Sequence, residues 1–582
     1  MVPSTVILVS LFTLACAAPW KRDDGAPRVT IKSPQANIKG TTKGILGIHD
    51  GQVESFYGIP YAKPPVGDLR FKPPVRLTQP LGNLEATNDQ PESCPQFAIP
   101  PNIGSPLIPP ELLDTVFNLP ILQNLAVGKE DCLTINVQRP VGTKEGDKLP
   151  VMYWIFGGGF ELGSTSMYNG VGLVAEGVEI GKPFIFVAVN YRVGAFGFMP
   201  GKDLMEEGSS NAGLLDQRMG LEWVQDNIAS FGGDPDKVTL WGESAGAISI
   251  FSQLTLFNGN ITRNGKPLFH GAIMNSGSAV PTDPMDCPKA TKVYEQVLSA
   301  AGCDKAEDRL KCLRALSYDD MRKAANSVPA LLSYTSVALS YLPRPDGKNI
   351  PSSAEVFATS GNLPKVPFIL GDQEDEGTLF ALFQSNVTTT EDVENYLSTL
   401  YFNNASPEQI KSLVATYSPD PSEGSPFGTL IFNEVRPQFK RLAAILGDAV
   451  FTLTRRAVFN ISQTVQPEVN TWSYLSSYDF GTPVLGTFHG SDLLQVFFGI
   501  KPNYARHSMR AYFYNFAYNL DPNDSSGGSG KGTPKADLIS WPKWRDGNKL
   551  LHMGADSADL TDDNFRQDSF NFLLSNVEKL RY

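Results

Sequence analysis

The stretch KVTLWGESAGAISIFSQLTL, from Lys237 to Leu256, decides how the rest of the sequence is interpreted. VTLW has the composition of a buried strand, whereas the residues after Ala245 have the pattern of a helix. Between them lies Gly242-Glu243-Ser244-Ala245-Gly246, a G-x-S-x-G motif. Small neighbours allow the sharp strand-to-helix turn of a nucleophile elbow. The flanking pattern favours this interpretation over an ordinary glycine turn that exposes a serine.

Strand-like and helix-like segments alternate along the 582 residues. Helical patterns occupy residues 211–231 and 439–459, and several strand-like runs are apolar on both faces, which is typical of buried parallel strands. The predicted strands lie within 133–140, 149–156, 183–192, 237–241, 271–278, 366–372 and 471–481. This alternation predicts an α/β fold with a central, mostly parallel sheet flanked by helices. No repeat or composition shift marks a boundary, so we expect one domain over residues 23–582.

A nucleophilic serine needs a base, and the sequence contains five histidines: His49, His270, His489, His507 and His552. In folds with this elbow the chain order is serine, acid, histidine, which removes the first two. His489 follows a predicted strand in a glycine-flanked loop, where catalytic groups are common. His507 lies in a helical pattern and is expected to be structural. His552 remains the second candidate.

Four carboxylates follow the predicted strand 366–372: Asp372, Glu374, Asp375 and Glu376. One of them is expected to be the acid that orients the base, and spacing alone does not choose among them. A solvated acidic turn is the alternative, and a cation site is a less favoured one.

Gly157-Gly158-Gly159 directly follows the predicted strand 149–156. Glycines allow the backbone to approach a substrate, and backbone N–H groups are the usual donors to an oxyanion. The N–H of Ala245 would complete such a hole. The alternatives are a tight turn or a dinucleotide loop, but the G-x-G-x-x-G pattern is not matched.

The N-terminus predicts export from the cell. Residues 6–18 are apolar and end in Ala15-Cys16-Ala17, which predicts a signal peptide over residues 1–18. Lys21-Arg22 is consistent with a pro-segment over residues 19–22. The segment before the apolar run lacks Lys and Arg, so a buried strand is the alternative. No other segment is long and apolar enough for a membrane span, and a net charge of −12 argues against a nucleic-acid partner. We expect a secreted, extracellular, soluble protein.

Five cysteines remain after the predicted leader. Pairing of sequence neighbours suggests the disulfides Cys94–Cys132 and Cys303–Cys312, with Cys287 left over. In a secreted chain the N-x-S/T triplets become glycosylation candidates, and we expect some of them to be modified. They are at Asn260, Asn386, Asn404, Asn460 and Asn523.

The sequence resembles the type-B carboxylesterase/lipase family, and within it the secreted fungal Candida rugosa lipase-like lipases and sterol esterases. The resemblance covers nearly the whole chain after the predicted leader. It is carried by ESFYGIPYAKPPVGDLRFKPP, KEDCLTINV, GGGF, NYRVGAFGF, FGGDPDKVTLWGESAGA, MNSGS, GDQEDEGT and GTFHGSD. KEDC stands where the family usually has SEDC, and Cys287 has no obvious partner.

The resemblance implies the α/β-hydrolase fold, with large loop insertions, and ester hydrolysis through an acyl-enzyme, without a metal or organic cofactor. It makes Ser244 the nucleophile, Glu376 the acid and His489 the base. It places the oxyanion hole at the backbone N–H groups of Gly158, Gly159 and Ala245. The family's two disulfides fall on the two pairs suggested above.

The loop between Cys94 and Cys132 contains ELLDTVFNLPILQNL, residues 111–125, which has few charges. A helix would put Leu112, Leu113, Val116 and Phe117 on one side, with Leu122 in a second apolar patch after Pro120. In the resembling lipases this disulfide-closed loop is a mobile lid. We therefore favour a lid over residues 95–131 rather than a permanently buried helix.

An apolar lid predicts lipid-like substrates, either long-chain acylglycerols or sterol esters, met at an interface without stable membrane insertion. One alternative is a general carboxylesterase for small soluble esters. A second is a non-catalytic cholinesterase-like binding protein, which the presence of all three triad candidates disfavours. An exposed apolar lid is also compatible with a homodimer.

Overall fold

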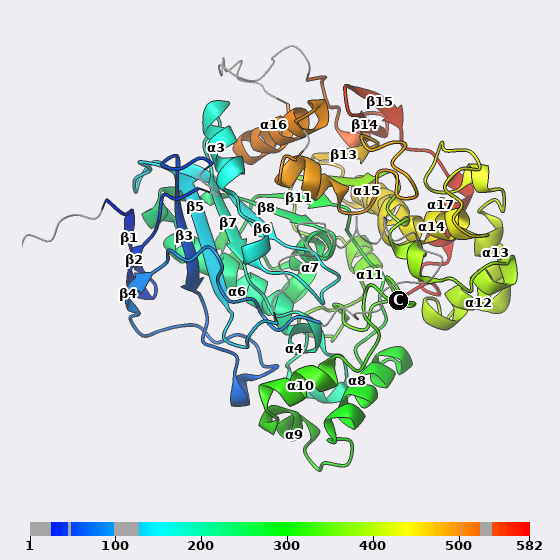
Figure 1. The fold of residues 1–582 in the computed structure, drawn as a ribbon, viewed down its shortest axis with the longest axis horizontal. Helices are drawn as coiled ribbons and strands as arrows, with labels where there is room; N and C mark the ends of the chain where they lie inside the picture. The colour runs from blue at the N-terminus through cyan, green and yellow to red at the C-terminus, as the bar shows by residue number, and fades with distance from the viewer. Residues whose placement is uncertain (1–24, 45–47, 98–126, 501, 524–537) are drawn as a thin grey trace, which may run out of the picture.

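The computed structural model describes residues 25–44, 48–97, 127–500, 502–523 and 538–582 (Figure 1). The predicted signal peptide and pro-segment lie outside these ranges. So do the five predicted lid residues Leu112, Leu113, Val116, Phe117 and Leu122.

A ten-stranded sheet forms the centre of the fold, with six parallel and three antiparallel neighbour pairs. Its order is β15 (Ala558–Asp562), β14 (Lys549–Met553), β13 (Thr471–Ser476), β12 (Phe368–Gln373), β11 (Gly271–Asn275), β8 (Gly233–Glu243), β6 (Leu149–Ile155), β7 (Ile185–Val189), β5 (Thr134–Pro140) and β3 (Val53–Pro60). Every predicted strand is present, and the mostly parallel α/β fold is confirmed.

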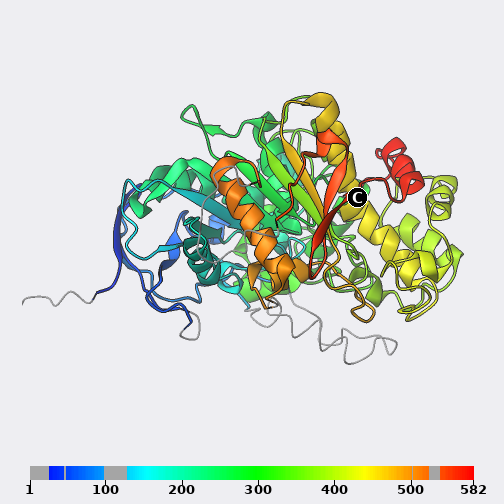
Figure 2. The same cartoon turned by 90° about the horizontal axis from the view of Figure 1, so that it is seen from above.

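The central strands are buried on both faces, as their apolar runs predicted. All residues of β7, β11, β12 and β13 are buried, because helices cover both faces of the sheet (Figure 2). Strand β5 is buried from Ile135 to Arg139 although it alternates apolar and polar residues, and it is antiparallel to both its neighbours, β3 and β7. A small three-stranded sheet of β1 (Arg28–Lys32), β2 (Gln35–Lys39) and β4 (Gly82–Glu85) lies at the N-terminal side.

The helices that matter most for the site follow or flank the parallel strands. Helix α7 (Ala245–Gly259) connects β8 to β11, and α16 (Tyr504–Asn519) packs on β6, β8 and β11. The other helices are α3 (Val171–Glu179), α4 (Gly194–Phe198), α5 (Lys202–Glu207), α6 (Ala212–Asn227), α8 (Pro288–Ala301), α9 (Arg309–Ala315), α10 (Tyr318–Ala325), α11 (Ala354–Thr359), α12 (Thr390–Leu400), α13 (Pro407–Ala415), α14 (Phe439–Gly447), α15 (Leu453–Val465) and α17 (Gln567–Ser575). Among the described residues, none of these helices has the length and apolar composition needed to cross a membrane.

The helical pattern predicted over residues 439–459 is interrupted. A π-helical turn at Asp448–Thr452 separates α14 from α15. Such turns are frequent at functional sites, and this one places Val450 and Phe451 on the wall of the pocket described below.

Two disulfides have the predicted pairing, Cys94–Cys132 and Cys303–Cys312. Cys287 is a free thiol. It is the N-cap of α8, where its sulfur accepts a hydrogen bond from the Ala290 N–H.

Candidate active site

Ser244 stands at the turn between β8 and α7, as the motif predicted. Its backbone is in a strained region, with φ 56° and ψ −126°. The Ser244 N–H donates to the carbonyl of Asn275, the last residue of β11, at 2.9 Å. A Cβ on Gly246 would lie 2.0 Å from the carbonyl oxygen of Ile155, so the turn requires glycine there. This packing holds the serine hydroxyl toward the pocket.

Three side chains from distant parts of the chain form a continuous hydrogen-bond chain. The Ser244 hydroxyl lies 2.8 Å from His489 Nε2, and His489 Nδ1 lies 2.5 Å from Glu376 Oε2. Glu376 is 1% exposed and His489 7% exposed. With the ring neutral and protonated at Nδ1, Nε2 is free to accept the serine proton.

Spacing in the sequence did not decide which of four carboxylates contacts His489, and the structure shows that it is Glu376. Glu376 Oε1 accepts the Gln373 N–H at 2.7 Å, which turns the other oxygen toward His489. Asp372 accepts from Arg455 Nε. Asp375 accepts from the N–H groups of Phe427 and Thr487. Glu374 is largely buried and lies beside Ser477.

The other histidines lie elsewhere. His552 is on β14, where its ring nitrogens contact Ser477 and Asp559. His507 is on α16, where its Nδ1 lies 3.7 Å from Glu176 Oε1. Neither residue lines the pocket that contains Ser244.

Carboxylates surround His489 and alter its pKa. Burial of the His489 ring lowers its pKa, but the negative charge of Glu376 and the hydrogen bond to it outweigh this effect, so the pKa is raised to about 9. Glu243, inside the motif, contributes in the same direction, and its Oε1 lies 3.4 Å from His489 Nε2. Burial raises the pKa of Glu243 itself to about 8.

The three-glycine loop lies directly against the serine. A Cβ on Gly157 would be 2.8 Å from Ser244 Cβ, so the two turns approach as closely as glycine allows. Gly158, Gly159 and Ala245 all line the pocket beside Ser244. Within the described part of the chain, the N–H groups of Gly158 and Gly159 donate no hydrogen bond. They are therefore available to a substrate oxygen.

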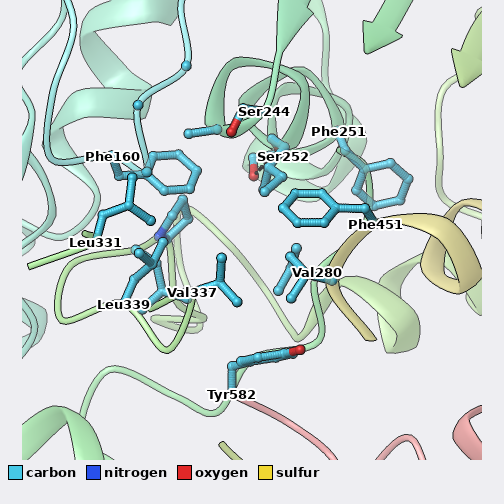
Figure 3. Close-up of a pocket in the computed structure, with 18 of the residues that line it drawn as sticks. Phe160, Ser244, Phe251, Ser252, Val280, Leu331, Val337, Leu339, Phe451 and Tyr582 are labelled. Carbon is cyan, nitrogen blue, oxygen red and sulfur yellow. Dashed lines mark hydrogen bonds between the residues drawn. The ribbon is translucent and has the colours of Figure 1, made fainter. Parts of the chain in front are cut away.

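A pocket of about 160 Å³ opens beside the serine, and its lining is mostly apolar. Figure 3 shows Ser244 and Tyr582 at opposite ends of this pocket. Apolar side chains between them include Phe160, Phe251, Val280, Leu331, Val337, Leu339 and Phe451. Sequence reasoning had missed this lining. No residue pattern pointed to it, because the π turn that carries Phe451 lies inside a segment whose pattern predicted one continuous helix.

The N-terminal end of the predicted lid loop is hydrogen-bonded to the segment that follows the glycine loop. Gln96 and Gly163 form a reciprocal pair of hydrogen bonds, from Gln96 Nε2 to the Gly163 carbonyl and from the Gly163 N–H to Gln96 Oε1. The Phe97 N–H donates to the Glu161 carbonyl at 3.0 Å. The first described residues of the loop closed by Cys94–Cys132 therefore lie beside the pocket wall, which includes Gly163.

The mixed sheet, the strained serine turn and the Ser244–His489–Glu376 chain define an α/β-hydrolase. The profile of the carboxylesterase family matches residues 26–573, and the chain belongs to that family.

Relatives of known name support the same assignment. The chain is 52% identical to "Secreted lipase 1" of Botryotinia fuckeliana, over 99% of this chain and 98% of that protein. It is 53% identical to "Secreted triacylglycerol lipase LIP1" of Gibberella zeae, over 96% and 92% of the two chains. Among solved structures, Aspergillus niger EstA superposes with a TM-score of 0.77 at 26% identity, covering 96% of this chain and 99% of that one.

Proposed function

We propose that the protein is a secreted serine hydrolase that cleaves lipid-like carboxylic esters through an acyl-enzyme. The observation that carries the proposal is the Ser244–His489–Glu376 hydrogen-bond chain opening into an apolar pocket.

In the proposed reaction, Ser244 Oγ attacks the ester carbonyl carbon while His489 Nε2 takes its proton. The N–H groups of Gly158, Gly159 and Ala245 stabilise the oxyanion. His489 then returns the proton to the leaving alcohol as the C–O bond breaks. Water, deprotonated by His489, hydrolyses the acyl-enzyme by the same path. Glu376 holds the ring and stabilises the imidazolium throughout.

The pocket supports an apolar acyl group as the substrate part bound next to the serine. Its aromatic and aliphatic walls bury methylenes favourably, by about 0.8 kcal/mol each. A polar acyl group would lose hydrogen bonds to water without replacement. The names of the two relatives, lipase and triacylglycerol lipase, agree with long-chain acylglycerols, and sterol esters are the second choice.

An apolar surface patch supports action on aggregated lipid. Leu430, Ile431, Phe432 and Phe480 are 61–68% exposed. The loop that carries the first three is braced from within, because Lys440 Nζ donates to the carbonyls of Leu430 and Phe432. Such rigidly presented apolar side chains are typical of surfaces that contact lipid or protein. We propose that this patch and the predicted lid, residues 95–131, contact the lipid together.

Export is part of the same proposal. It is supported by the predicted signal peptide, by the two disulfides and by the word "secreted" in the names of both relatives. Of the five predicted glycosylation sites, Asn260, Asn386 and Asn404 have exposed side chains, and Asn460 and Asn523 are half-buried. We expect sugars first at the exposed three.

The deciding experiment compares kcat/KM on p-nitrophenyl butyrate, triolein and cholesteryl oleate, with Ser244→Ala as the control. The proposal expects hydrolysis of at least one lipid ester with higher kcat/KM than the butyrate ester, and none by the variant. A preference for the butyrate ester alone would instead favour the small-ester carboxylesterase. No hydrolysis of any ester would favour a binding protein.

A further inference from the structure

We propose that a polar pocket between α15 and α17 is the seat of an N-linked glycan on Asn460. The first sugar of this glycan then packs against the protein instead of extending into solvent. The inference goes beyond ester hydrolysis. It rests on export, which is part of the proposed function, because a chain receives such a glycan only on the secretory route.

The pocket is polar and separate from the candidate active site. It has a volume of about 320 Å³ and shares no lining residue with the apolar pocket beside Ser244. Its wall comes from α15, α17, the short helix Trp544–Asp546 and the end of β15. Exposed polar side chains form the rim, namely Asn548, Asp562, Asn564 and Gln567. The Asn548 and Asn564 side chains make no hydrogen bond to another described residue, so both amides are available to a ligand.

The buried part of the lining centres on Arg456, which is 2% exposed. Its guanidinium stacks on the rings of Phe565 and Phe570, at 4.4 and 5.3 Å from the ring centroids. Arg456 Nε donates to Asp563 Oδ1, and Nη1 donates to the Phe565 carbonyl. Nη2 is buried and has no hydrogen-bond partner among the described residues. Because an unpaired buried donor is costly, this nitrogen indicates that the pocket takes a ligand oxygen.

The charges around the pocket favour a neutral ligand over an anion. Burial raises the pKa of Asp563, but the charges of Arg455 and Arg456 outweigh this effect and lower the pKa to about 2. Asp562, also on the wall, accepts from Lys549 Nζ at 2.6 Å. Two carboxylates in the lining would repel a phosphate or a carboxylate. The hydroxyl and acetamido groups of N-acetylglucosamine are neutral and both donate and accept hydrogen bonds, which matches the amides, carboxylates and guanidinium of this pocket.

Asn460 supplies the covalent attachment at the edge of the pocket. It begins the triplet Asn460-Ile461-Ser462 and lies one turn after Arg456 on the same face of α15. Its Nδ2 donates to the Arg456 carbonyl at 3.0 Å. An amide nitrogen that carries a sugar keeps one N–H, so this bond can persist. Of the five predicted glycosylation sites, all within the described ranges, Asn460 alone lines this pocket. A sugar tethered there has a high effective concentration beside the pocket.

The first test measures access to the glycan with endoglycosidase H, which cuts between the first two sugars. The full chain, with its own N-terminus, is expressed in a fungal host and collected from the medium, and glycopeptides are followed by mass spectrometry. We expect release at Asn460 to be about tenfold slower in the native than in the denatured protein, which corresponds to roughly 1.4 kcal/mol of seating free energy. Glycans at the exposed sites Asn260, Asn386 and Asn404 should be released equally fast in both states.

The outcomes separate this inference from the proposed export. A secreted protein with no glycan on Asn460 overturns the inference and leaves export intact. Equal release at Asn460 in the native and the denatured protein does the same. A chain that stays inside the cell and carries no glycan overturns both proposals.

The second test changes the rim of the pocket. Asn564→Ala combined with Gln567→Ala removes two exposed amides that face the sugar, and Gln463→Ala, exposed on α15 outside the lining, is the matched control. We expect release at Asn460 of the native double variant to approach the rate in the denatured protein, while the control keeps the wild-type rate. Thermal unfolding verifies that each variant is folded. A double variant that is folded and releases the glycan as slowly as the wild type overturns the assignment of this pocket as the seat.

Discussion

The carboxylate of Asp375 accepts the backbone N–H of Thr487 at 2.9 Å, which ties the residue before the candidate acid to the loop that carries the candidate base. Thr487 precedes His489 by two residues, and the backbone of Asp375 also bridges to Phe488. The same carboxylate accepts the Phe427 N–H at 2.8 Å. Asp375 therefore acts as a positioning residue for Glu376 and His489, although it touches neither the serine nor the pocket.

Removing this tie should weaken catalysis more than substrate binding. Asp375→Ala removes the acceptor of the Thr487 and Phe427 N–H groups and of the Ser425 hydroxyl, and each buried donor left unpaired costs about 1–3 kcal/mol in stability. Because the His489 loop is then less well positioned, we expect kcat to fall with KM nearly unchanged. Asp375→Asn keeps one acceptor oxygen and should recover part of kcat. Steady-state kinetics with thermal unfolding check this, and equal activity of Asp375→Ala and the wild type would contradict the role.

Replacement of Glu376 should reduce kcat severely, even though the serine and the histidine stay in place. Glu376→Gln removes the negative charge that stabilises the imidazolium, and its amide can hold the ring in the wrong tautomer. The expected fall in kcat is on the order of 10⁴, the size seen for the equivalent change in a serine protease triad. Asp372 is buried nearby but bonded to Arg455, so the fall should not be rescued by that carboxylate.

The pH profile should report the carboxylates around His489. The neutral ring is the base, so kcat/KM rises as pH increases through the pKa of His489, which Glu376 and Glu243 raise to about 9. Both carboxylates favour the protonated ring. Glu243→Gln therefore lowers this pKa and moves the acid limb of the kcat/KM profile to lower pH. A limb that stays in place, or that moves to higher pH, would show that Glu243 does not act on the base.

The glycine loop offers a test of oxyanion stabilisation. Gly158 has φ 108°, and a Cβ there would lie 2.5 Å from the Leu162 carbonyl oxygen. Gly158→Ala should displace the loop and its N–H donors, with kcat reduced by roughly 10²–10³ as for the loss of one donor. Gly172→Ala, where a Cβ meets nothing within 4 Å, is the control and should be active. Full activity of both variants would place the oxyanion elsewhere.

The elbow and the strands of the sheet were predictable because their signals are local. Ser244 is surrounded by its motif, and the strands β6, β7, β8, β11, β12 and β13 contain short apolar runs followed by turns. The acid, by contrast, could not be predicted from a local signal. Four carboxylates share one turn, and the backbone N–H of Gln373, which turns Glu376 toward the base, has no signature in the residue types. Only the family resemblance distinguished Glu376 at that stage.

Other features depend on contacts that no local pattern encodes. Strand β5 was predicted together with the parallel strands, yet its antiparallel direction follows from its pairing with β3 and β7. The pocket wall joins segments near residues 160, 251, 280, 331–345, 450 and 582, which are far apart in the sequence. Tyr582 in particular is held at the site by backbone hydrogen bonds with Pro281 and Asp283 and by the Arg344 side chain.

The central claim is that Ser244 is a nucleophile activated by His489. The most direct measurement is mass spectrometry of peptides after reaction with a fluorophosphonate, on the wild type, Ser244→Ala and His489→Ala. The account predicts one phosphonyl group on Ser244 of the wild type, none at that position in Ser244→Ala, and strongly slowed labelling in His489→Ala. A wild-type protein that stays unlabelled at Ser244, or is labelled equally fast without His489, would contradict it.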